Sequence, residues 1–192
     1  DLGHRIEVQE IASNAGGESS ASTSEPTAVV TAAAPATFGK TSVGASSDYF
    51  VAERKRVNRY ALASAGSVSK LSIYLAPTGT AGQQVLKGLI YADSASAPAA
   101  LLATSTQLTF SSTGAAGWYD LTFSSPVKLA AGNYWIGVLT GATAGVAGFR
   151  FDSVSGSRDY NSNTFASGPT NPFGAVTVDS EQTSLYATYT AG

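Results

Sequence analysis

The chain has 192 residues, of which 43% are hydrophobic, 10% are aromatic and only 12% are charged. Soluble domains carry about 25% charged residues, so the charged fraction is half the usual one. A net charge of −2 argues against nucleic acid or an anionic membrane surface as the main partner, and no stretch approaches the ~18 apolar residues of a membrane span. The hydrophobic content is sufficient for a buried core.

Three residue types are absent or nearly so, and each absence excludes a class of chemistry. The chain has no cysteine, which excludes disulfides, zinc–thiolate sites, iron–sulfur clusters and thiol catalysis. Its single histidine, His4, leaves no histidine cluster for a metal and argues against a Ser–His–Asp triad. It has no methionine and starts at Asp1, so we expect a segment of a longer protein. The surplus of Ala, Ser, Thr and Gly is typical of secreted, extracellular bacterial proteins.

The first thirty residues predict a β-hairpin. Residues 4–12 alternate between apolar and polar side chains, which indicates a strand. The cluster Asn14-Ala-Gly-Gly17 is typical of a turn, and residues 18–30 predict a second strand rich in Ser and Thr. Because two strands alone are marginally stable in water, this hairpin needs a further sheet.

The segment LGHRIEVQEIASNAGGESSASTSEPTAVV, residues 2–30, resembles the last two strands of the immunoglobulin-like repeats of bacterial surface proteins. The resemblance implies that residues 1–30 end such a repeat and that residues 31–36 form a linker to the next module. Without the rest of the repeat, we expect these strands to be disordered, to pack on the following module, or to pair with an exposed sheet edge of another chain.

From residue 37 onward, short strands with turn signals about every ten residues indicate a sandwich or a barrel. No window of 11 or more residues keeps a helical period. The expected strands are residues 48–63, 68–76, 84–92, 101–110, 118–123, 133–140, 146–152 and 184–190.

This second region also resembles a known module. The segments IYADSASAPAALLATSTQLTF, GWYDLTFSSPVKLAAGNYWIGVLTG and GPTNPFG are similar to a β-sandwich accessory module of secreted bacterial proteins, which often lies beside polysaccharide-degrading domains or immunoglobulin-like repeats. The resemblance implies an all-β fold, an antiparallel jelly-roll-like β-sandwich over residues 37–192.

Residues 153–179 are the longest stretch without a strong strand pattern, and loops of more than ~12–15 residues are often functional. The stretch concentrates side chains that suit hydroxyl groups and sugar rings. Together with an aromatic residue on a neighbouring strand, the predicted ligand-binding residues are Arg158, Asp159, Tyr160, Asn161, Asn163 and Trp135. The alternative is a surface loop held by its own hydrogen bonds and Asx turns.

Aromatic rings are the second kind of candidate, because flat rings can stack on the C–H faces of sugars. Trp135 and Tyr74 are out of phase with the apolar faces of their strands, so we expect them to reach the outer surface. The other candidates are Trp118, Tyr91, Tyr160, Phe165 and Phe173. The alternative is that a two-sheet sandwich buries most of its large rings.

The basic run at residues 53–59 is unusual in so uncharged a chain. As a strand it places Arg54, Arg56 and Asn58 on one face, where Arg–carboxylate contacts could bind an acidic polysaccharide. The favoured interpretation is an edge strand that its charges protect from aggregation.

No metal or catalytic motif is evident. A structural calcium could use carboxylates among Asp48, Asp93, Asp152, Asp159, Asp179 and Glu181, but no EF-hand spacing is present. Ordinary turn residues are the favoured interpretation, and no cofactor is predicted. Two carboxylates could meet for glycoside hydrolysis, although nothing in the sequence points to it.

The prediction is therefore a non-catalytic, extracellular module that binds a polysaccharide or other glycan and tethers a larger enzyme or surface protein to it. The main alternative is a structural spacer or adhesion domain without a small ligand. A hydrolase or lyase domain and a phage- or pilus-like receptor-binding protein remain open. A binding module should expose aromatic rings, whereas a spacer should bury nearly all of them.

Overall fold

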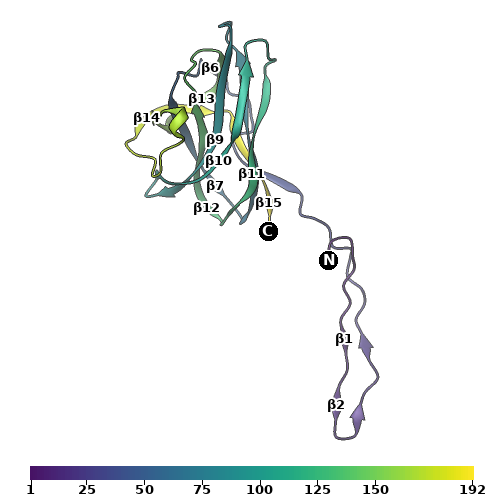
Figure 1. Ribbon diagram of the computed structural model, residues 1–192. Coiled ribbons are helices and arrows are strands. Elements are labelled where there is room, and N and C mark those ends of the chain that lie inside the picture. Colours follow the sequence, from purple (N-terminus) through teal and green to yellow (C-terminus); the bar gives the residue numbers. More distant parts are fainter. The chain divides into compact units, whose positions relative to one another are not determined.

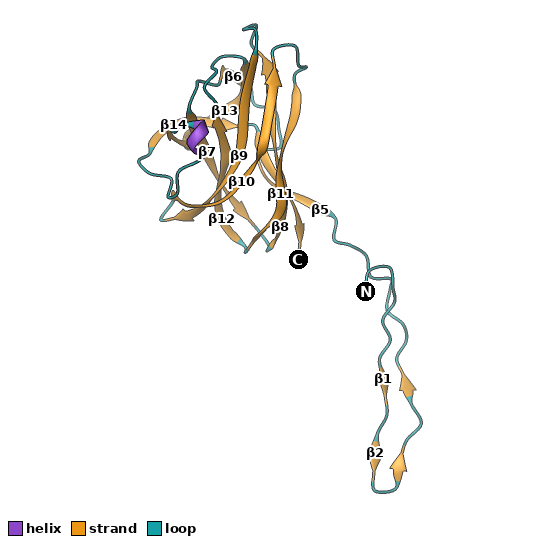
Figure 2. Ribbon diagram, in the orientation of Figure 1, coloured by secondary structure: helices purple, strands orange, loops and turns teal.

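The computed structural model describes all 192 residues and divides them into two units, Asp1–Ala34 and Pro35–Gly192. Almost all regular structure is β-strand, and a single 3-10 turn at Phe165–Ser167 is the one helical element (Figure 2). The first unit holds β1 (Gln9–Glu10), β2 (Ser13–Asn14), β3 (Gly17–Glu18) and β4 (Ser22–Thr23).

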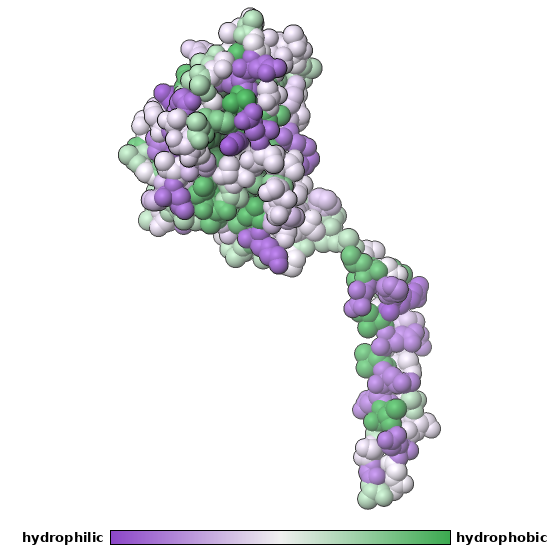
Figure 3. Space-filling view, in the orientation of Figure 1, coloured by the Kyte–Doolittle hydropathy of each residue, from purple (hydrophilic) through white to green (hydrophobic).

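The first unit is a single long hairpin. β1 pairs with β4 and β2 pairs with β3, both antiparallel. Hydroxyl groups replace part of the backbone ladder: Ser24 Oγ accepts the N–H of Val8 at 3.0 Å, and Thr27 Oγ1 accepts the N–H of Ile6 at 3.0 Å. The expected hairpin is therefore present, but its apolar side chains have no core to enter. Figure 3 shows them interleaved with hydrophilic ones; those exposed are Leu2, Ile6, Val8, Ile11 and Val29.

The second unit is an antiparallel β-sandwich, and the all-β prediction is confirmed. Its strands are β5 (Pro35–Gly39), β6 (Ser46–Tyr49), β7 (Arg54–Leu62), β8 (Gly66–Pro77), β9 (Gln83–Ser94), β10 (Ala97–Ser111), β11 (Gly117–Leu129), β12 (Gly132–Thr140), β13 (Ala147–Ser162), β14 (Thr177–Thr183) and β15 (Leu185–Ala191). They are hydrogen-bonded in the order β10-β9-β12-β7-β13-β8-β15-β5, with β11 on β8 and with β6 and β14 on β13.

The long strand β13 connects the two layers of the sandwich. Its first half, residues 147–151, pairs with β6 and β8. Its second half, residues 158–162, pairs with β7, and β14 pairs with both parts, at residues 151–153 and 158–160. Between the halves the register with β14 shifts, which is a bulge that lets one strand bend from one layer to the other.

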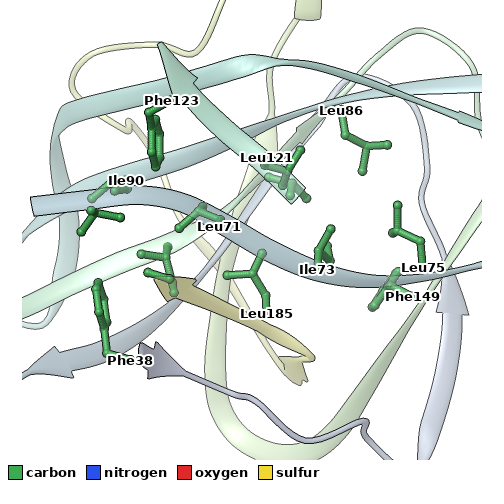
Figure 4. Close-up of a cluster of buried hydrophobic side chains, with 14 of the residues drawn as sticks. Phe38, Leu71, Ile73, Leu75, Leu86, Ile90, Leu121, Phe123, Phe149 and Leu185 are labelled. Atoms are coloured by element: carbon green, nitrogen blue, oxygen red, sulfur yellow. The ribbon is translucent and has the colours of Figure 1, made fainter. Parts of the chain in front are cut away.

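The core lies between the layers. Period-two alternation turns Leu71, Ile73 and Leu75 of β8 inward, and all three are fully buried. They belong to the same cluster as Ile90 of β9 and Ile136 of β12, which come from the opposite layer. Figure 4 shows side chains of both layers converging on this space. A continuous apolar core without disulfides is sufficient for a domain of this size.

The expected strands are found, and most of them are longer than expected. The strand assignment differs from the expectation at three places. β6 and β7 are separate where one strand at 48–63 was expected, and β5 and β14 were not expected as strands. The expectation of an edge strand at 53–59 is wrong, because β7 lies between β12 and β13. Its cations are accommodated inside the fold: Lys55 is fully buried and Arg56 is 5% exposed.

Candidate functional site

The polar residues predicted as a ligand site are divided between the two faces of β13. The expectation of a long loop at 153–179 is wrong, because 153–162 continue β13 and 177–183 form β14. Only residues 163–176, here called the β13–β14 loop, connect the two strands. Side chains alternate along a strand, so Arg158 and Tyr160 lie on one face and Asp159 and Asn161 on the other.

Arg158 is buried and binds carboxylates of its own chain. Its Nη2 lies 2.5 Å from Oδ2 of Asp179 across the β13–β14 pair. Its Nη1 forms an ion pair with Glu181 that lacks the alignment of a hydrogen bond. Tyr160 is half-buried, and the guanidinium of Arg54 lies 4.9 Å from the centre of its ring. These groups join β7, β13 and β14 to one another.

The asparagines hold the β13–β14 loop. Asn161 Nδ2 donates to the Phe173 carbonyl at 3.0 Å, and Asn163 Nδ2 donates to the Gly168 carbonyl at 2.8 Å. Lys55 Nζ also donates to the Phe173 carbonyl, at 2.7 Å, and burial lowers its pKa to about 8. These contacts match the alternative interpretation of a loop held by its own hydrogen bonds.

Trp135 lies beneath this loop. It is 3% exposed and packs with Tyr91, Leu139 and Phe173 in a second apolar cluster on the outer side of the sheet. Its indole Nε1 donates to Asp93 Oδ1 at 2.8 Å. The expectation that Trp135 reaches the surface is therefore wrong, because a segment distant in sequence covers it.

Asp159 lies opposite Val57 of the same cluster in the ladder between β13 and β7, and it is 5% exposed. Burial and the neighbouring carboxylate of Asp179 raise the pKa of Asp159 to about 6. Desolvation disfavours the charged form, so this carboxyl group is a poor calcium ligand at its position. The structure contains no group of three or more His, Asp or Glu side chains placed to hold a metal ion.

A different part of the sandwich has the geometry of a binding surface. An open groove of about 410 Å³ lies over β6, the start of β13 and the end of β8. β6 lies at the upper end of the sandwich in Figure 1. The side chains and backbone that line it include Ser47, Tyr49, Ala76, Thr78, Gly148 and Arg150.

The floor of the groove is made by small residues in register. Gly148 of β13 lies opposite Tyr49 on β6 and opposite Ala76 on β8. A Cβ atom at Gly148 would lie 3.2 Å from the Ala76 carbonyl oxygen and 3.3 Å from that of Asp48, tighter than ordinary contact. The position therefore favours glycine, and the missing side chain leaves the hollow open.

Tyr49 forms the wall of the groove on β6. At 52% exposure it is the most accessible aromatic residue, since every other Tyr, Trp and Phe is buried or half-buried. Its neighbour Phe50 points inward and stacks on Phe149 with ring centres 4.5 Å apart. This alternation holds β6 on the core and leaves the Tyr49 ring in solvent.

Three further aromatic rings lie on the outer face of the sheet formed by β11, β8 and β15, the same face that carries the groove floor. Tyr74 precedes Ala76 by two residues, so both side chains leave the same side of β8. Trp118 of β11 lies opposite Tyr74 with ring centres 5.6 Å apart, and Tyr186 of β15 lies 5.0 Å from Trp118. All three are half-buried. We call these residues the aromatic platform.

Tyr49 was not among the residues predicted from the sequence. Its signal is the alternation Ser47-Asp48-Tyr49-Phe50, in which one of two adjacent rings must point outward. Sequence alone could not show that Gly148, a hundred residues away, lies beside it. Tyr74 was expected on the outer surface and does lie on the outer face of its strand, half-buried.

Comparisons with known proteins found no match. No family model, no curated protein and no solved structure matches this chain. No helix in the structure has the length and apolar character needed to cross a membrane.

Proposed function

We propose that the chain is a non-catalytic, extracellular carbohydrate-binding module that tethers a larger enzyme or surface protein to a glycan. The observation that carries the proposal is the exposed Tyr49 ring beside an open groove with a floor of Gly148 and Ala76. Pockets with an aromatic wall and a few convergent polar groups are the default binding sites of a protein.

The chemistry of the groove suits a sugar ring. A pyranose presents one apolar C–H face and a rim of hydroxyl groups. The Tyr49 ring supplies a flat apolar surface, while Ser47 and Arg150 supply hydrogen-bonding groups along the lining. The aromatic platform extends this face along β8, which favours an extended glycan over a single sugar.

The resemblances support the same context. We propose that residues 37–192 belong to the accessory sandwich modules of secreted bacterial proteins and have a jelly-roll-like topology. We propose that residues 1–30 end an immunoglobulin-like repeat and pair through their strand edges with another chain. The exposed apolar side chains of the hairpin, such as Val8 at 65%, favour such a partner over an isolated hairpin.

The second candidate function is a structural spacer or adhesion domain. It is favoured by the burial of Trp135 and by the absence of strongly exposed rings other than Tyr49. The two candidates differ in one measurable property, because only the first requires affinity for a free glycan.

Isothermal titration against a panel of neutral and acidic polysaccharides, with calcium present, tests the proposal. Binding by the wild type that falls about fivefold in Tyr49→Ala supports it, since loss of one stacked ring is worth about 1 kcal/mol. Val178→Ala is the matched control, because Val178 is 56% exposed but lies on β14 and does not line the groove. Absence of binding to every glycan would favour the spacer, and release of reducing sugar would indicate an enzyme.

A further inference from the structure

Arg150 lines the groove and lies on β13, the strand that also contributes Gly148 to the groove floor. It follows Gly148 by two residues on β13, so both face the same side of the sheet. Asp48 also contributes to the lining, but it is in register with Phe149, which points into the core. Burial lowers the pKa of Arg56 to about 9, and the charge of Asp48 partly opposes that shift, so the Asp48 carboxylate acts on Arg56. Since side chains alternate along β6, the Asp48 side chain leaves the opposite side of that strand from Tyr49.

The guanidinium of Arg150 is held by backbone carbonyls along one edge. Nε donates to the Gly44 carbonyl at 2.9 Å and Nη2 donates to the Ala45 carbonyl at 2.8 Å. These bonds use the side-on edge of the planar group. The end-on edge, formed by Nη1 and the second hydrogen of Nη2, has no hydrogen-bond partner in the structure and keeps two parallel donors.

The segment that holds Arg150 is itself fixed. Gly44 N–H donates to Ser184 Oγ at 2.9 Å, and Ala45 N–H donates to Asp152 Oδ1 at 2.8 Å. A Cβ atom at Gly44 would lie 2.2 Å from the Phe151 carbonyl carbon, so only glycine allows this approach. The guanidinium therefore has a fixed orientation before any ligand arrives, which reduces the entropy lost on binding.

The charge at this end of the groove is not balanced. Asp152 is the acid nearest to Arg150 along the strand, and it binds Lys40 with Nζ 2.5 Å from Oδ2. Lys40, Arg150 and Ala45 N–H all lower the pKa of Asp152, so the carboxyl group is ionised at neutral pH. Two cations thus share one carboxylate, and Arg150 forms no ion pair with any residue of the chain.

We propose that the groove selects glycans that carry a carboxylate, with the end-on edge of Arg150 binding the carboxylate of a uronic acid unit in a bidentate pair. This inference rests on the proposed function and names its substrate class. Two parallel N–H···O bonds match the spacing of carboxylate oxygens, and charge-assisted bonds are about twice as strong as neutral ones. The Tyr49 ring, across Gly148, takes the C–H face of the same or the adjoining sugar.

The decisive experiment changes the ligand rather than the protein. Isothermal titration compares a uronic acid oligosaccharide with the same oligosaccharide after its carboxyl groups are reduced to primary alcohols. We expect the wild type to bind the acidic form at least tenfold more tightly, with a preference that decreases as salt rises. A sulfated neutral oligosaccharide of the same length distinguishes carboxylate recognition from general attraction of anions.

A variant pair assigns the effect to the end-on edge. Arg150→Lys keeps the charge but removes the fork, so we expect the preference for the acidic form to fall to about twofold. Because Arg150 holds residues 44 and 45, thermal unfolding is measured for each variant. Lys40→Gln serves as a control that removes a neighbouring cation and keeps the guanidinium of Arg150. This control should keep most of the preference for the acidic oligosaccharide.

The outcomes separate the two proposals. Equal affinity for the acidic and reduced oligosaccharides, with loss of both in Tyr49→Ala, would overturn the carboxylate inference and leave the carbohydrate module standing. Tighter binding of the sulfated form would also overturn it. No binding of any of the three would overturn both proposals.

Discussion

Arg158 and Asp179 form an ion pair that joins β13 to β14, with Nη2 2.5 Å from Oδ2 and the arginine side chain only 5% exposed. Glu181 approaches the same guanidinium from two residues further along β14. β14 pairs with no other strand, so its attachment to the sandwich depends on this cluster, on its backbone ladder with β13 and on two hydrogen bonds with the Asn58 side chain of β7.

Arg158→Met should therefore destabilise the sandwich by about 3 kcal/mol, because two carboxylates lose their partner in a poorly hydrated place. Urea unfolding measures the loss. The matched control is Lys70→Met, which breaks the Lys70–Asp120 pair, whose side chains are 35% and 47% exposed. Exposed pairs contribute less than about 1 kcal/mol. Equal losses in the two variants would contradict the importance assigned to Arg158.

Asp159 should make stability depend on pH. Its folded pKa of about 6 is above the ordinary value of 3.8, so the folded state binds the proton more tightly than the unfolded chain. The resulting stability is present below about pH 4 and is lost as pH rises through 6. Asp159→Asn should thus stabilise the protein by about 1 kcal/mol at pH 8 and by little at pH 4.

Asp179→Asn provides the opposite case for the same measurement. It removes a carboxylate that Arg158 binds, so it should destabilise the protein at pH 8. Urea unfolding of both variants at the two pH values checks the signs. A gain at pH 8 no larger than at pH 4 in Asp159→Asn would show that this carboxyl group has an ordinary pKa.

The aromatic platform should matter for long glycans only. Trp118 lies opposite Tyr74 on β11, further from Tyr49 than the groove floor. Trp118→Ala should weaken binding of a long oligosaccharide about tenfold and leave that of a disaccharide nearly unchanged. Titrations with a length series measure this. Leu102→Ala, at an exposed apolar residue of β10, is the control. A uniform loss at all lengths would contradict an extended site.

The hairpin should be removable without loss of the sandwich. The residues of both apolar clusters lie within 35–192, and the hairpin exposes nearly all of its side chains. Brief proteolysis should cut within residues 1–34 and leave a fragment from about residue 35 onward. The fragment should unfold at the same temperature as the whole chain, by calorimetry. A decrease of several degrees would show that the hairpin contributes to the stability of the second unit.

Local pattern determined much of this fold. Alternation in Leu71-Ser-Ile-Tyr-Leu75 depends only on the period of a strand, and it placed the core face of β8 correctly. The site was predicted less well, because polarity does not distinguish a side chain that binds a ligand from one that binds its own chain. Asn161 and Asn163 have the chemistry of a sugar site, yet their donors are used by the β13–β14 loop.

By itself, the sequence determined the all-β class, the hairpin at the start and the exclusion of cysteine and histidine-cluster chemistry, because these follow from composition and from neighbours along the chain. Only the tertiary structure decided that the β13–β14 loop buries Trp135 and that Gly148 leaves a groove beside Tyr49. Burial and groove shape depend on contacts between residues far apart in sequence, and such contacts produce no periodic pattern in the sequence.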